Sequence, residues 1–576
     1  CLSPASHWMV FARPLSMPLS PPPPLPPLDL PQMGCCSSHH PSRIVSTKSG
    51  SVQGRRIVNE GELRVDAFLG IPFAKPPVGQ LRFRKPEPAE PWSGVRECNR
   101  FARRCIQKDY FMHDKIMKRA GSEDCLYLNV FTPVWQSPTE GFPVMVFVHG
   151  GGFSMHDAET YGEEGIARFL VRKGVVVVTI QYRLGYLGFF STGDEACRGN
   201  WGLWDQTMAL RWIQENIEAF SGNKHNVTLF GQSAGGASVD LLSLSPHSRN
   251  LFHKVCPMAG VGTAEWTFHP DLPSKCRQKA RRMGVEENNS ERMMDKLREM
   301  KPSCFAAGVE PEEGIEKAIM DNTLDITPII DGDFLPAHPS ELRKTAPPKP
   351  RMTGVSKLEA AIFLMNYKVT LERLQEMVGR SLPQSVPGVE KIRDDLVESY
   401  LDTGKLSPNH VLLRAFAEAY GDRSMHVPTL RMITDSLKYH PSAPVYSYVF
   451  EYSNRNAYGL LSFLMPIKDA THCTELNYLF GKGILWPYKF TANDQQMLHL
   501  FTTAFTNFAK YGNPNGGSIE AARTPSISPN TLPVFWPAAT HENPETHYVF
   551  DLIPRVSTTL MYGRPRRIAQ YQEEYQ

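Results

Sequence analysis

The stretch that decides the fold reads Asn226-Val227-Thr228-Leu229-Phe230-Gly231-Gln232-Ser233-Ala234-Gly235-Gly236. Its first five residues predict a short strand, Asn226–Phe230, and the small-residue run Ala234–Leu244 predicts a helix. The residues between them form a G-x-S-x-G motif, whose glycines permit a tight turn that presents the serine at the carboxyl edge of a sheet. A serine hydroxyl becomes a useful nucleophile only when a base takes its proton. The pattern therefore predicts a nucleophilic Ser233 rather than an ordinary turn serine.

Strands and helices alternate on both sides of this stretch. Short β-branched runs predict strands and 3–4 spacing of apolar residues predicts helices, at Val144–Val148, Val175–Gln181, Leu203–Phe220, Val445–Glu451 and Asp494–Tyr511. Such alternation is typical of α/β proteins with a mostly parallel sheet covered by helices on both faces. No period of 20–50 residues repeats, which excludes a solenoid.

A second glycine cluster follows the predicted strand Val144–Val148, in the run His149-Gly150-Gly151-Gly152-Phe153. Consecutive glycines cost conformational entropy, so packing alone gives little reason for them. Their amides can approach a substrate closely and face developing negative charge. We expect the amides of Gly151 and Gly152, together with that of Ala234, to form an oxyanion hole. His149 is expected to position the loop through hydrogen bonds rather than to act as a base.

The chain is expected to hold one large domain, from residue 43 to 570. No Gly/Ser linker divides it, and the more charged, mostly helical region from about 276 to 423 is expected to be a lid or insertion beside the sheet. Residues 1–32 form a leader with 10 of the 48 prolines, and proline supplies no backbone donor, so this leader is not expected to join the fold.

Composition excludes several classes of protein. The 62 Lys and Arg residues nearly balance the 59 Asp and Glu residues, for a net charge of +3, which argues against a dedicated nucleic-acid binder. No apolar run reaches the ~20 residues of a membrane-spanning helix. The 11 cysteines show no zinc-ligand spacing, so we expect no structural metal. Cys105 and Cys125 enclose a polar loop and are candidates for a disulfide, which would stabilise the fold by roughly 3 kcal/mol.

An alternative start lies at Met33, where the run Met33-Gly34-Cys35-Cys36-Ser37-Ser38 matches the N-myristoylation pattern. With that start, Gly34 would be acylated and Cys35 and Cys36 would be palmitoylation sites, which together give stable attachment to the inner leaflet. The alternatives are a chance match of a short pattern and a Pro-rich docking arm. A cytosolic, acylated protein would keep Cys105 and Cys125 reduced, so the anchor and the disulfide predict different compartments.

Further segments resemble the type-B carboxylesterases, a family with the α/β-hydrolase fold that includes liver and gut esterases and cholinesterases; the nematode gut-type esterases resemble the chain most. The resemblance covers about Arg43 to Arg567, and besides the two motifs above it is carried by Leu69-Gly70-Ile71-Pro72-Phe73-Ala74, Ser122-Glu123-Asp124-Cys125-Leu126-Tyr127-Leu128-Asn129-Val130, Gln181-Tyr182-Arg183-Leu184-Gly185 and Gly199-Asn200-Trp201-Gly202-Leu203-Trp204-Asp205-Gln206. It implies an α/β-hydrolase fold with a helical lid region and hydrolysis of small-molecule carboxylic esters without a metal or organic cofactor.

The resemblance also implies a triad in the chain order serine, acid, histidine. The family's histidine segment matches Thr471-His472-Cys473-Thr474-Glu475-Leu476-Asn477-Tyr478-Leu479-Phe480-Gly481, which makes His472 the expected base. The acid segment matches Thr353-Gly354-Val355-Ser356-Lys357-Leu358-Glu359, which makes Glu359 the expected acid. Ala360 and Ala361 stand where the family has a glycine beside this glutamate, so Asp331 and Asp333 remain alternatives, although they are more typical of a structural turn.

Departures from the family bear on the substrate. Cholinesterases place an aromatic residue shortly before the Ser-Glu-Asp-Cys segment to hold a quaternary ammonium by cation–π attraction. Here Met112–Asp124 contains neither Trp nor Tyr and includes Lys115 and Lys118, which disfavours choline esters. Gln232 replaces the glutamate usual before the nucleophile. The family's second disulfide is expected to be missing, because Val285 stands where the partner of Cys276 would be. Cys304 is an alternative partner for Cys276. A non-catalytic adhesion relative of the same fold and a lipase or amidase remain the competing functions.

Overall fold

The computed structural model describes residues 40–108, 119–308, 314–365, 367–401, 408–465, 467–517 and 531–575, with the side chains of 408 and 409 left aside. All of these residues belong to one compact unit, Ser37–Gln576. Its first strand, β1 (Pro41–Thr47), begins two residues before the start expected from the sequence. Gly34, Cys35 and Cys36, like the whole leader 1–32, lie outside the described residues.

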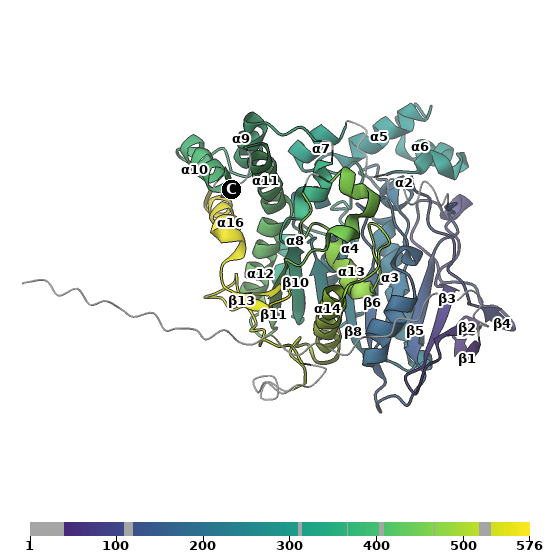
Figure 1. The fold of residues 1–576 in the computed structure, drawn as a ribbon. Coiled ribbons are helices and arrows are strands. Elements are labelled where there is room, and N and C mark those ends of the chain that lie inside the picture. Colours follow the sequence, from purple (N-terminus) through teal and green to yellow (C-terminus); the bar gives the residue numbers. More distant parts are fainter. Residues whose placement is uncertain are drawn as a thin grey trace, which may run out of the picture. The chain divides into compact units, whose positions relative to one another are not determined.

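Within the described residues, thirteen strands form one sheet in the order β1-β2-β3-β5-β7-β6-β8-β9-β10-β11-β12-β13, with β4 paired to β2 (Figure 1). Besides β1, the strands are β2 (Gly50–Val58), β3 (Val65–Pro72), β4 (Val95–Glu97), β5 (Tyr127–Pro133), β6 (Phe142–Val148), β7 (Val176–Ile180), β8 (Gly222–Gln232), β9 (Lys254–Met258), β10 (Arg351–Ser356), β11 (Val445–Phe450), β12 (His547–Phe550) and β13 (Arg555–Ser557).

The centre of the sheet is parallel. Every neighbouring pair from β7 through β6, β8, β9, β10 and β11 to β12 is parallel, whereas the pairs among β1, β2, β3, β5 and β7 and the pair β12–β13 are antiparallel. Carboxyl ends of parallel strands meet at one edge of a sheet, which is where such folds bind ligands. The predicted mostly parallel sheet is therefore confirmed.

The α-helices of the described residues are α2 (Gly185–Phe189), α3 (Trp201–Asn216), α4 (Ala234–Leu244), α5 (Leu272–Arg282), α6 (Ser290–Glu299), α7 (Ile315–Asp321), α8 (Pro339–Thr345), α9 (Leu371–Arg380), α10 (Val389–Leu401), α11 (Pro408–Gly421), α12 (Val427–Tyr439), α13 (Asn477–Phe480), α14 (Ala492–Tyr511) and α16 (Arg564–Tyr575). The predicted helix Leu203–Phe220 is α3 followed by a short 3₁₀ turn, η5 (Ile217–Phe220). The helix predicted from Ala234 to Leu244 is confirmed as α4.

Helices cover both faces of the parallel strands. Alternate residues of β6 belong to different cores: Val146 packs in the cluster that contains Leu210 of α3 and Leu241 of α4, and Phe147 packs in the cluster that contains Phe501 of α14. Successive side chains of a strand point to opposite faces, so a strand buried on both sides reads as an unbroken apolar run. This explains the sequence of Val144–Val148.

The region from 276 to 423 is not helical throughout. It contains β10, which lies between β9 and β11 in the middle of the sheet, although α5–α11 supply most of its remaining elements. The sequence pattern missed this strand because it has only six residues and lies between Lys349 and Lys357 in a charged region. The consequence is functional, because β10 ends three residues before Glu359.

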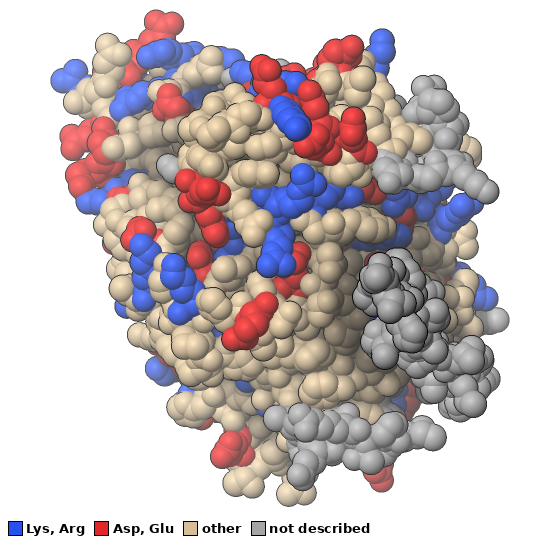
Figure 2. All heavy atoms as spheres, turned by 90° about the vertical axis from the view of Figure 1, so that its left-hand side faces the viewer, with Lys and Arg blue, Asp and Glu red and all other residues tan. Residues whose placement is uncertain are grey.

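The surface agrees with the charge balance of the sequence. Acidic and basic side chains are interspersed on the face shown in Figure 2, with broad areas of other residues between them. Within the described part of the chain, no helix is both long and apolar enough to cross a membrane.

Candidate active site

Ser233 occupies a strained turn between the end of β8 and the start of α4. Its backbone has φ 60° and ψ −129°, in the left-handed half of backbone space that non-glycine residues rarely adopt. The turn is held because the Ser233 amide donates to the carbonyl of Met258 in β9 over 2.8 Å. Such strain persists only where the surrounding structure enforces it, and it concentrates at functional sites.

Glycines at the flanks let this turn sit directly against the end of β6. A Cβ on Gly231 would come within 2.6 Å of the Val148 carbonyl oxygen, and one on Gly235 within 2.1 Å of the same atom. No side chain fits at either position. The two outer glycines of the motif are thus explained by close backbone packing, which fixes where the serine stands.

The glycine loop after β6 lies beside the nucleophile turn. A Cβ on Gly150 would meet the carbonyl oxygen of Gln232 at 2.4 Å and Ser233 Cβ at 3.0 Å. Gly151 and Gly152 have φ of 100° and 58°, and both line the same pocket as Ser233. Among the described residues, neither of their amides has a hydrogen-bond acceptor. These amides can donate hydrogen bonds to an anion bound next to Ser233.

His149 contacts the glycine loop and the buried Tyr182. Its ring stacks on Tyr182 with centroids 4.5 Å apart, Nδ1 lies 2.9 Å from the Gly150 carbonyl oxygen, and the Tyr182 hydroxyl donates to the His149 carbonyl over 2.8 Å. Burial lowers the pKa of His149 to about 4, so the ring is neutral near pH 7. These contacts suit a positioning role.

Glu359 and His472 form a buried pair. Glu359 begins the 3₁₀ helix η8 (Glu359–Leu364), and its Oε2 lies 2.6 Å from Nδ1 of His472. The backbones are joined as well, because the His472 amide donates to the Glu359 carbonyl over 3.2 Å. Ser356, at the end of β10, donates its amide to the other carboxylate oxygen of Glu359. The sheet therefore fixes the carboxylate and the carboxylate fixes the ring.

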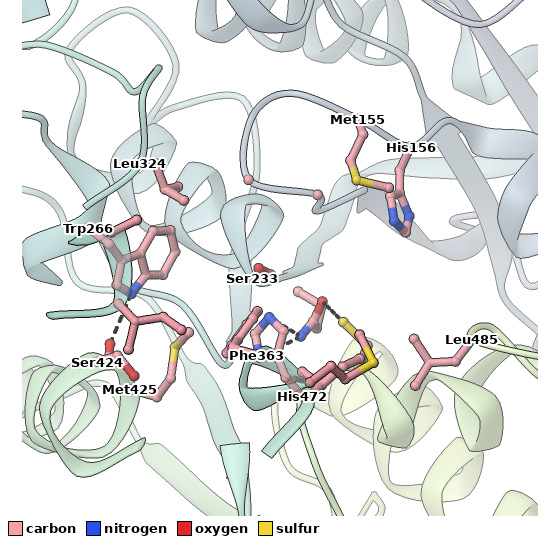
Figure 3. Close-up of a pocket in the computed structure, with 18 of the residues that line it drawn as sticks. Met155, His156, Ser233, Trp266, Leu324, Phe363, Ser424, Met425, His472 and Leu485 are labelled. Carbon is pink, nitrogen blue, oxygen red and sulfur yellow. Dashed lines mark hydrogen bonds between the residues drawn. The ribbon is translucent and has the colours of Figure 1, made fainter. Parts of the chain in front are cut away.

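Ser233 and His472 share a pocket without a direct hydrogen bond between their side chains. Instead, Nε2 of Gln232 lies 3.3 Å from Nδ1 and 3.2 Å from Nε2 of His472, and the Cys473 thiol lies 3.3 Å from Oε1 of Gln232 (Figure 3). Catalytic hydrogen bonds are often long before substrate binds. The Gln232 side chain thus lies against both ring nitrogens of His472.

The environment of His472 favours its charged form. Burial lowers the pKa of His472, but contacts with Cys473 and with the Glu359 carboxylate raise it more, so the pKa ends well above its usual 6.5. The Glu359 contact carries this shift on physical grounds, because a carboxylate is ionised at neutral pH and a bonded opposite charge favours the imidazolium.

Glu475 is a second buried carboxyl group at this site, and the sequence reasoning assigned it no role. Ser356 Oγ donates to Glu475 Oε2 over 3.2 Å. Burial first, and then the nearby Glu359 carboxylate, raise the pKa of Glu475 to about 8. At pH 7 the Glu475 carboxyl group is therefore mostly neutral. A carboxyl group three residues after the histidine was the signal that could have revealed it.

The pocket around Ser233 is apolar. Figure 3 shows Trp266, Leu324 and Met425 on one side of Ser233 and Met155 and Leu485 on the other. None of the described residues that line it is Asp, Glu, Lys or Arg, and the polar members are mainly Ser, Thr, Tyr and the catalytic candidates. Such a lining suits an uncharged ligand, because burying a charge without a partner is costly.

The alternative acids lie elsewhere. Asp331 accepts the amides of Asp333 and Leu335, and Asp333 pairs with Lys85 over 2.7 Å and His247 over 3.1 Å. These bonds close a turn outside the pocket, and neither aspartate is among the residues around Ser233. The structure brings Glu359, and not these two, to His472.

Cys105 and Cys125 are joined by a disulfide. Cys276 and Cys304 are free thiols, so Cys304 does not replace the partner that Cys276 lacks. The loop that the disulfide closes includes residues 109–118, which lie outside the described residues, as does the Met112–Lys118 part of the segment that bears on choline binding. Within the described residues, no group of three or more His, Cys, Asp or Glu side chains has an arrangement that could hold a metal ion.

The fold and the site define a class before any comparison. A parallel sheet with a strained serine between β8 and α4, a histidine–glutamate pair, and two unpaired glycine amides in one pocket are the features of an α/β-fold serine hydrolase. The chain belongs to the Carboxylesterase family, whose profile matches residues 41–562. It therefore has the α/β-hydrolase fold and is a carboxylic ester hydrolase, as the sequence resemblance implied.

Individual relatives agree with this assignment. The chain is 37% identical to the esterase cest-33 of Caenorhabditis elegans, over 87% of this chain and 88% of the relative. It is 35% identical to the pyrethroid hydrolase Ces2e of Rattus norvegicus, over 91% and 88%. It is also 36% identical to the medium-chain fatty acyl-CoA hydrolase precursor of Anas platyrhynchos, over 82% and 85%. The similarity to a nematode esterase is thus confirmed.

Proposed function

We propose that this protein hydrolyses uncharged carboxylic esters through an acyl-enzyme on Ser233, with His472 as base, Glu359 as its acid partner, and Gly151, Gly152 and Ala234 as the oxyanion hole. The observation that carries the proposal is the meeting of three features in one pocket: the strained Ser233, the His472–Glu359 pair, and two glycine amides without acceptors. The glycine loop follows β6, Ser233 follows β8, and Glu359 and His472 follow β10 and β11.

In the first half-reaction, neutral His472 accepts the proton of the Ser233 hydroxyl as its oxygen attacks the ester carbonyl carbon. Glu359 accepts a hydrogen bond from Nδ1 and stabilises the imidazolium that forms. The carbonyl oxygen becomes an oxyanion, which the amides of the glycine loop and of Ala234 bind. The carbon–oxygen bond to the alcohol then breaks, and His472 returns the proton to the leaving alcohol.

In the second half-reaction, water replaces the alcohol. His472 takes one proton from the water as its oxygen attacks the acyl carbon, and the same oxyanion hole binds the second tetrahedral intermediate. The bond to Ser233 breaks, His472 returns the proton to the serine oxygen, and the carboxylic acid leaves. Every proton is carried by His472, so no metal or organic cofactor enters either step.

The pocket sets the substrate class. Because its described lining holds no ionised side chain of Asp, Glu, Lys or Arg, it has no counter-charge for a cationic or anionic ester. Two apolar groups flank Ser233, one with Trp266 and Leu324 and one with Met155 and Leu485. They provide separate surfaces for the acyl and alcohol halves of a neutral ester. Choline esters are disfavoured on a separate ground, because Met112–Asp124 contains no Trp or Tyr for cation–π attraction to a quaternary ammonium.

Kinetic comparison of two serine variants tests the proposal. Ser233→Ala is expected to lower kcat for a neutral aryl butyrate by ~10⁵-fold or more, leaving the residual catalysis of the oxyanion hole and binding. Ser424→Ala is the matched control, since Ser424 lines the same pocket but its hydroxyl donates to the Tyr420 carbonyl over 2.6 Å. Full activity in Ser233→Ala would contradict the proposal, and no activity in the wild type would favour a non-catalytic adhesion relative.

A substrate panel separates the neighbouring reactions. For the wild type we expect kcat/KM to be highest for the neutral butyrate, and to be lower by at least ~10²-fold for butyrylcholine and for the matching anilide. Faster turnover of an emulsified long-chain triacylglycerol than of the soluble ester would identify a lipase. Comparable rates for anilide and ester would identify an amidase.

Membrane attachment is a separate part of the proposal. If translation starts at Met33, Gly34 carries myristate and Cys35 and Cys36 carry palmitate, which places the enzyme on the inner leaflet. The sequence pattern alone supports this part, and the Cys105–Cys125 disulfide argues against it, because the cytosol keeps thiols reduced. Mass spectrometry of the mature N-terminus tests it: an acylated peptide that begins at Gly34 is expected, and a peptide that begins before Met33 would contradict it.

A further inference from the structure

A second buried histidine–carboxylate pair lies behind the candidate catalytic acid. His426 ends η9 (Asp422–His426), a turn of π-helix between α11 and α12, and its side chain is almost fully buried. Its Nδ1 lies 2.7 Å from Asp422 Oδ1, and its Nε2 lies 3.2 Å from the carbonyl oxygen of Ser356. Single turns of π-helix inside α-helices occur frequently at functional sites.

The partners of His426 determine its protonation. A carboxylate and a peptide carbonyl are both acceptors, and a neutral imidazole has only one N–H to give. Both contacts are hydrogen bonds only when the ring is an imidazolium. Burial lowers the pKa of His426, but the carboxylates of Asp422 and Glu359 raise it above its usual 6.5. Geometry and electrostatics therefore agree on a positive charge.

Asp422, the carboxylate partner of His426, is itself held by an arginine and a tyrosine. Arg564 of α16 donates Nε to Asp422 over 3.1 Å and Nη2 to Glu418 over 2.8 Å, and the Tyr400 hydroxyl donates to Asp422 over 2.7 Å. Burial raises the pKa of Asp422, but Arg564 and His426 hold it below its usual value. Asp422 thus faces two cations, Arg564 and His426, while Glu418 pairs with Arg564 and with Arg414, whose Nε lies 3.0 Å from Glu418 Oε1.

This network reaches the catalytic pair through one residue. Ser356 accepts from His426 with its carbonyl and donates its amide to Glu359 Oε1 over 2.5 Å, and Glu359 Oε2 meets His472. Gly421 shows that His426 and Glu359 lie close together, because a Cβ on this glycine would be 3.6 Å from both Glu359 Cβ and His426 Cε1. Gly421 therefore lies next to both His426 and Glu359.

We infer that His426 is a positioning residue of the proposed esterase, whose contacts with Asp422 and with the Ser356 carbonyl fix the Ser356–Glu359 turn and hold the Glu359 carboxylate against His472. The inference rests on the proposed function of Glu359 and His472. It joins the C-terminal helix α16 to the catalytic acid through Arg564 and Asp422. The titratable groups that surround the network are Asp422 on the same turn, Glu418 and Arg414 on α11, Tyr400 on α10, Arg564 on α16, Glu359 on η8 and Glu475 on η11 (Thr474–Leu476).

The pH profile of His426→Gln tests the inference. Removing a buried cation makes it easier to protonate the Glu359–His472 pair, so the acid limb of kcat/KM is expected to move up by about half a pH unit or more, with activity at pH 7 lower by several-fold. His440→Gln is the matched control: His440 is also buried and bonds a backbone carbonyl, that of Arg343 over 2.8 Å, but lies outside this network. Its profile should be that of the wild type.

An unmoved acid limb in His426→Gln, with activity unchanged or scaled equally at every pH, would overturn the inference. Histidine ring ¹⁵N spectra of the wild type give a readout that does not depend on the folding of the variant. At pH 7.5 a doubly protonated ring whose signals stay unchanged after a fluorophosphonate occupies Ser233 is expected for His426. Its absence would also overturn the inference. Failure of the wild type to react with the fluorophosphonate would count against the proposed function instead.

Discussion

Oε2 of Glu359 lies 2.6 Å from Nδ1 of His472, although 113 residues separate them in the chain. The two residues follow neighbouring parallel strands, β10 and β11, and both are buried. Because Nδ1 faces the carboxylate, Nε2 is the ring nitrogen left to exchange protons with Ser233. The chemistry of the proposed site follows from this contact.

Replacing the acid is expected to leave the fold and remove most of the activity. Glu359→Gln keeps the shape of the side chain but offers an amide to Nδ1, which disfavours the productive tautomer of His472, so kcat should fall by about 10⁴-fold. Asp331→Asn changes the acid that the sequence left as an alternative and should retain wild-type kcat. Loss of activity in Asp331→Asn with an active Glu359→Gln would reverse the assignment.

The pH dependence of the reaction follows from the raised pKa of His472. The ring accepts a proton only when it is neutral, so kcat/KM should increase as the pH rises through a midpoint above 6.5. A wild-type midpoint at or below 6.5 would contradict the electrostatic account.

A methyl group in the glycine loop is expected to damage the oxyanion hole. Gly151 has φ 100°, and a Cβ there would meet the Met155 carbonyl oxygen at 2.4 Å, so Gly151→Ala must displace the loop and its amides. Misplacing one oxyanion donor lowers kcat by about 10²–10³-fold. Gly94→Ala is the control for backbone strain alone, because Gly94 also has a positive φ but faces open space. Its kcat should match the wild type.

The disulfide is expected to stabilise the fold without taking part in the reaction. Opening the loop with the double variant Cys105→Ser, Cys125→Ser should lower the free energy of unfolding by about 3 kcal/mol in the chain-entropy description. Denaturant unfolding measures this change. Cys304→Ser, which alters a free thiol, is the control. Equal stability of the double variant and wild-type protein under oxidising conditions would contradict the expected stabilisation.

The sequence predicted those parts of the site that are local in the chain. The turn at Ser233 and the loop at Gly151 and Gly152 could be recognised because each lies within a few residues of a strand end. At these strand ends the backbone packs so closely that only glycine fits. His472 and Glu359 required the family resemblance, since nothing in the spacing of two segments 113 residues apart says that they meet. The structure, and not the sequence, brings them together.

Contacts formed by the tertiary fold could not be predicted in this way. Strand β10 lies in a charged, helix-rich region and was missed, although it carries Ser356 and leads into Glu359. The hydrogen bonds from Ser356 to Glu359 and Glu475, and from His426 to Ser356, depend on burial and on the packing of distant elements. Residue type alone gives no sign that His426 lies next to Glu359, the proposed acid.

The most direct test of the central claim is to trap the acyl-enzyme analogue and locate it. A fluorophosphonate reacts with an activated serine to form a stable adduct, and peptide mass spectrometry then identifies the modified residue. The account predicts one adduct per chain, on Ser233, with labelling lost in Ser233→Ala and slowed in Glu359→Gln. An adduct on another residue, or labelling that persists in Ser233→Ala, would contradict it.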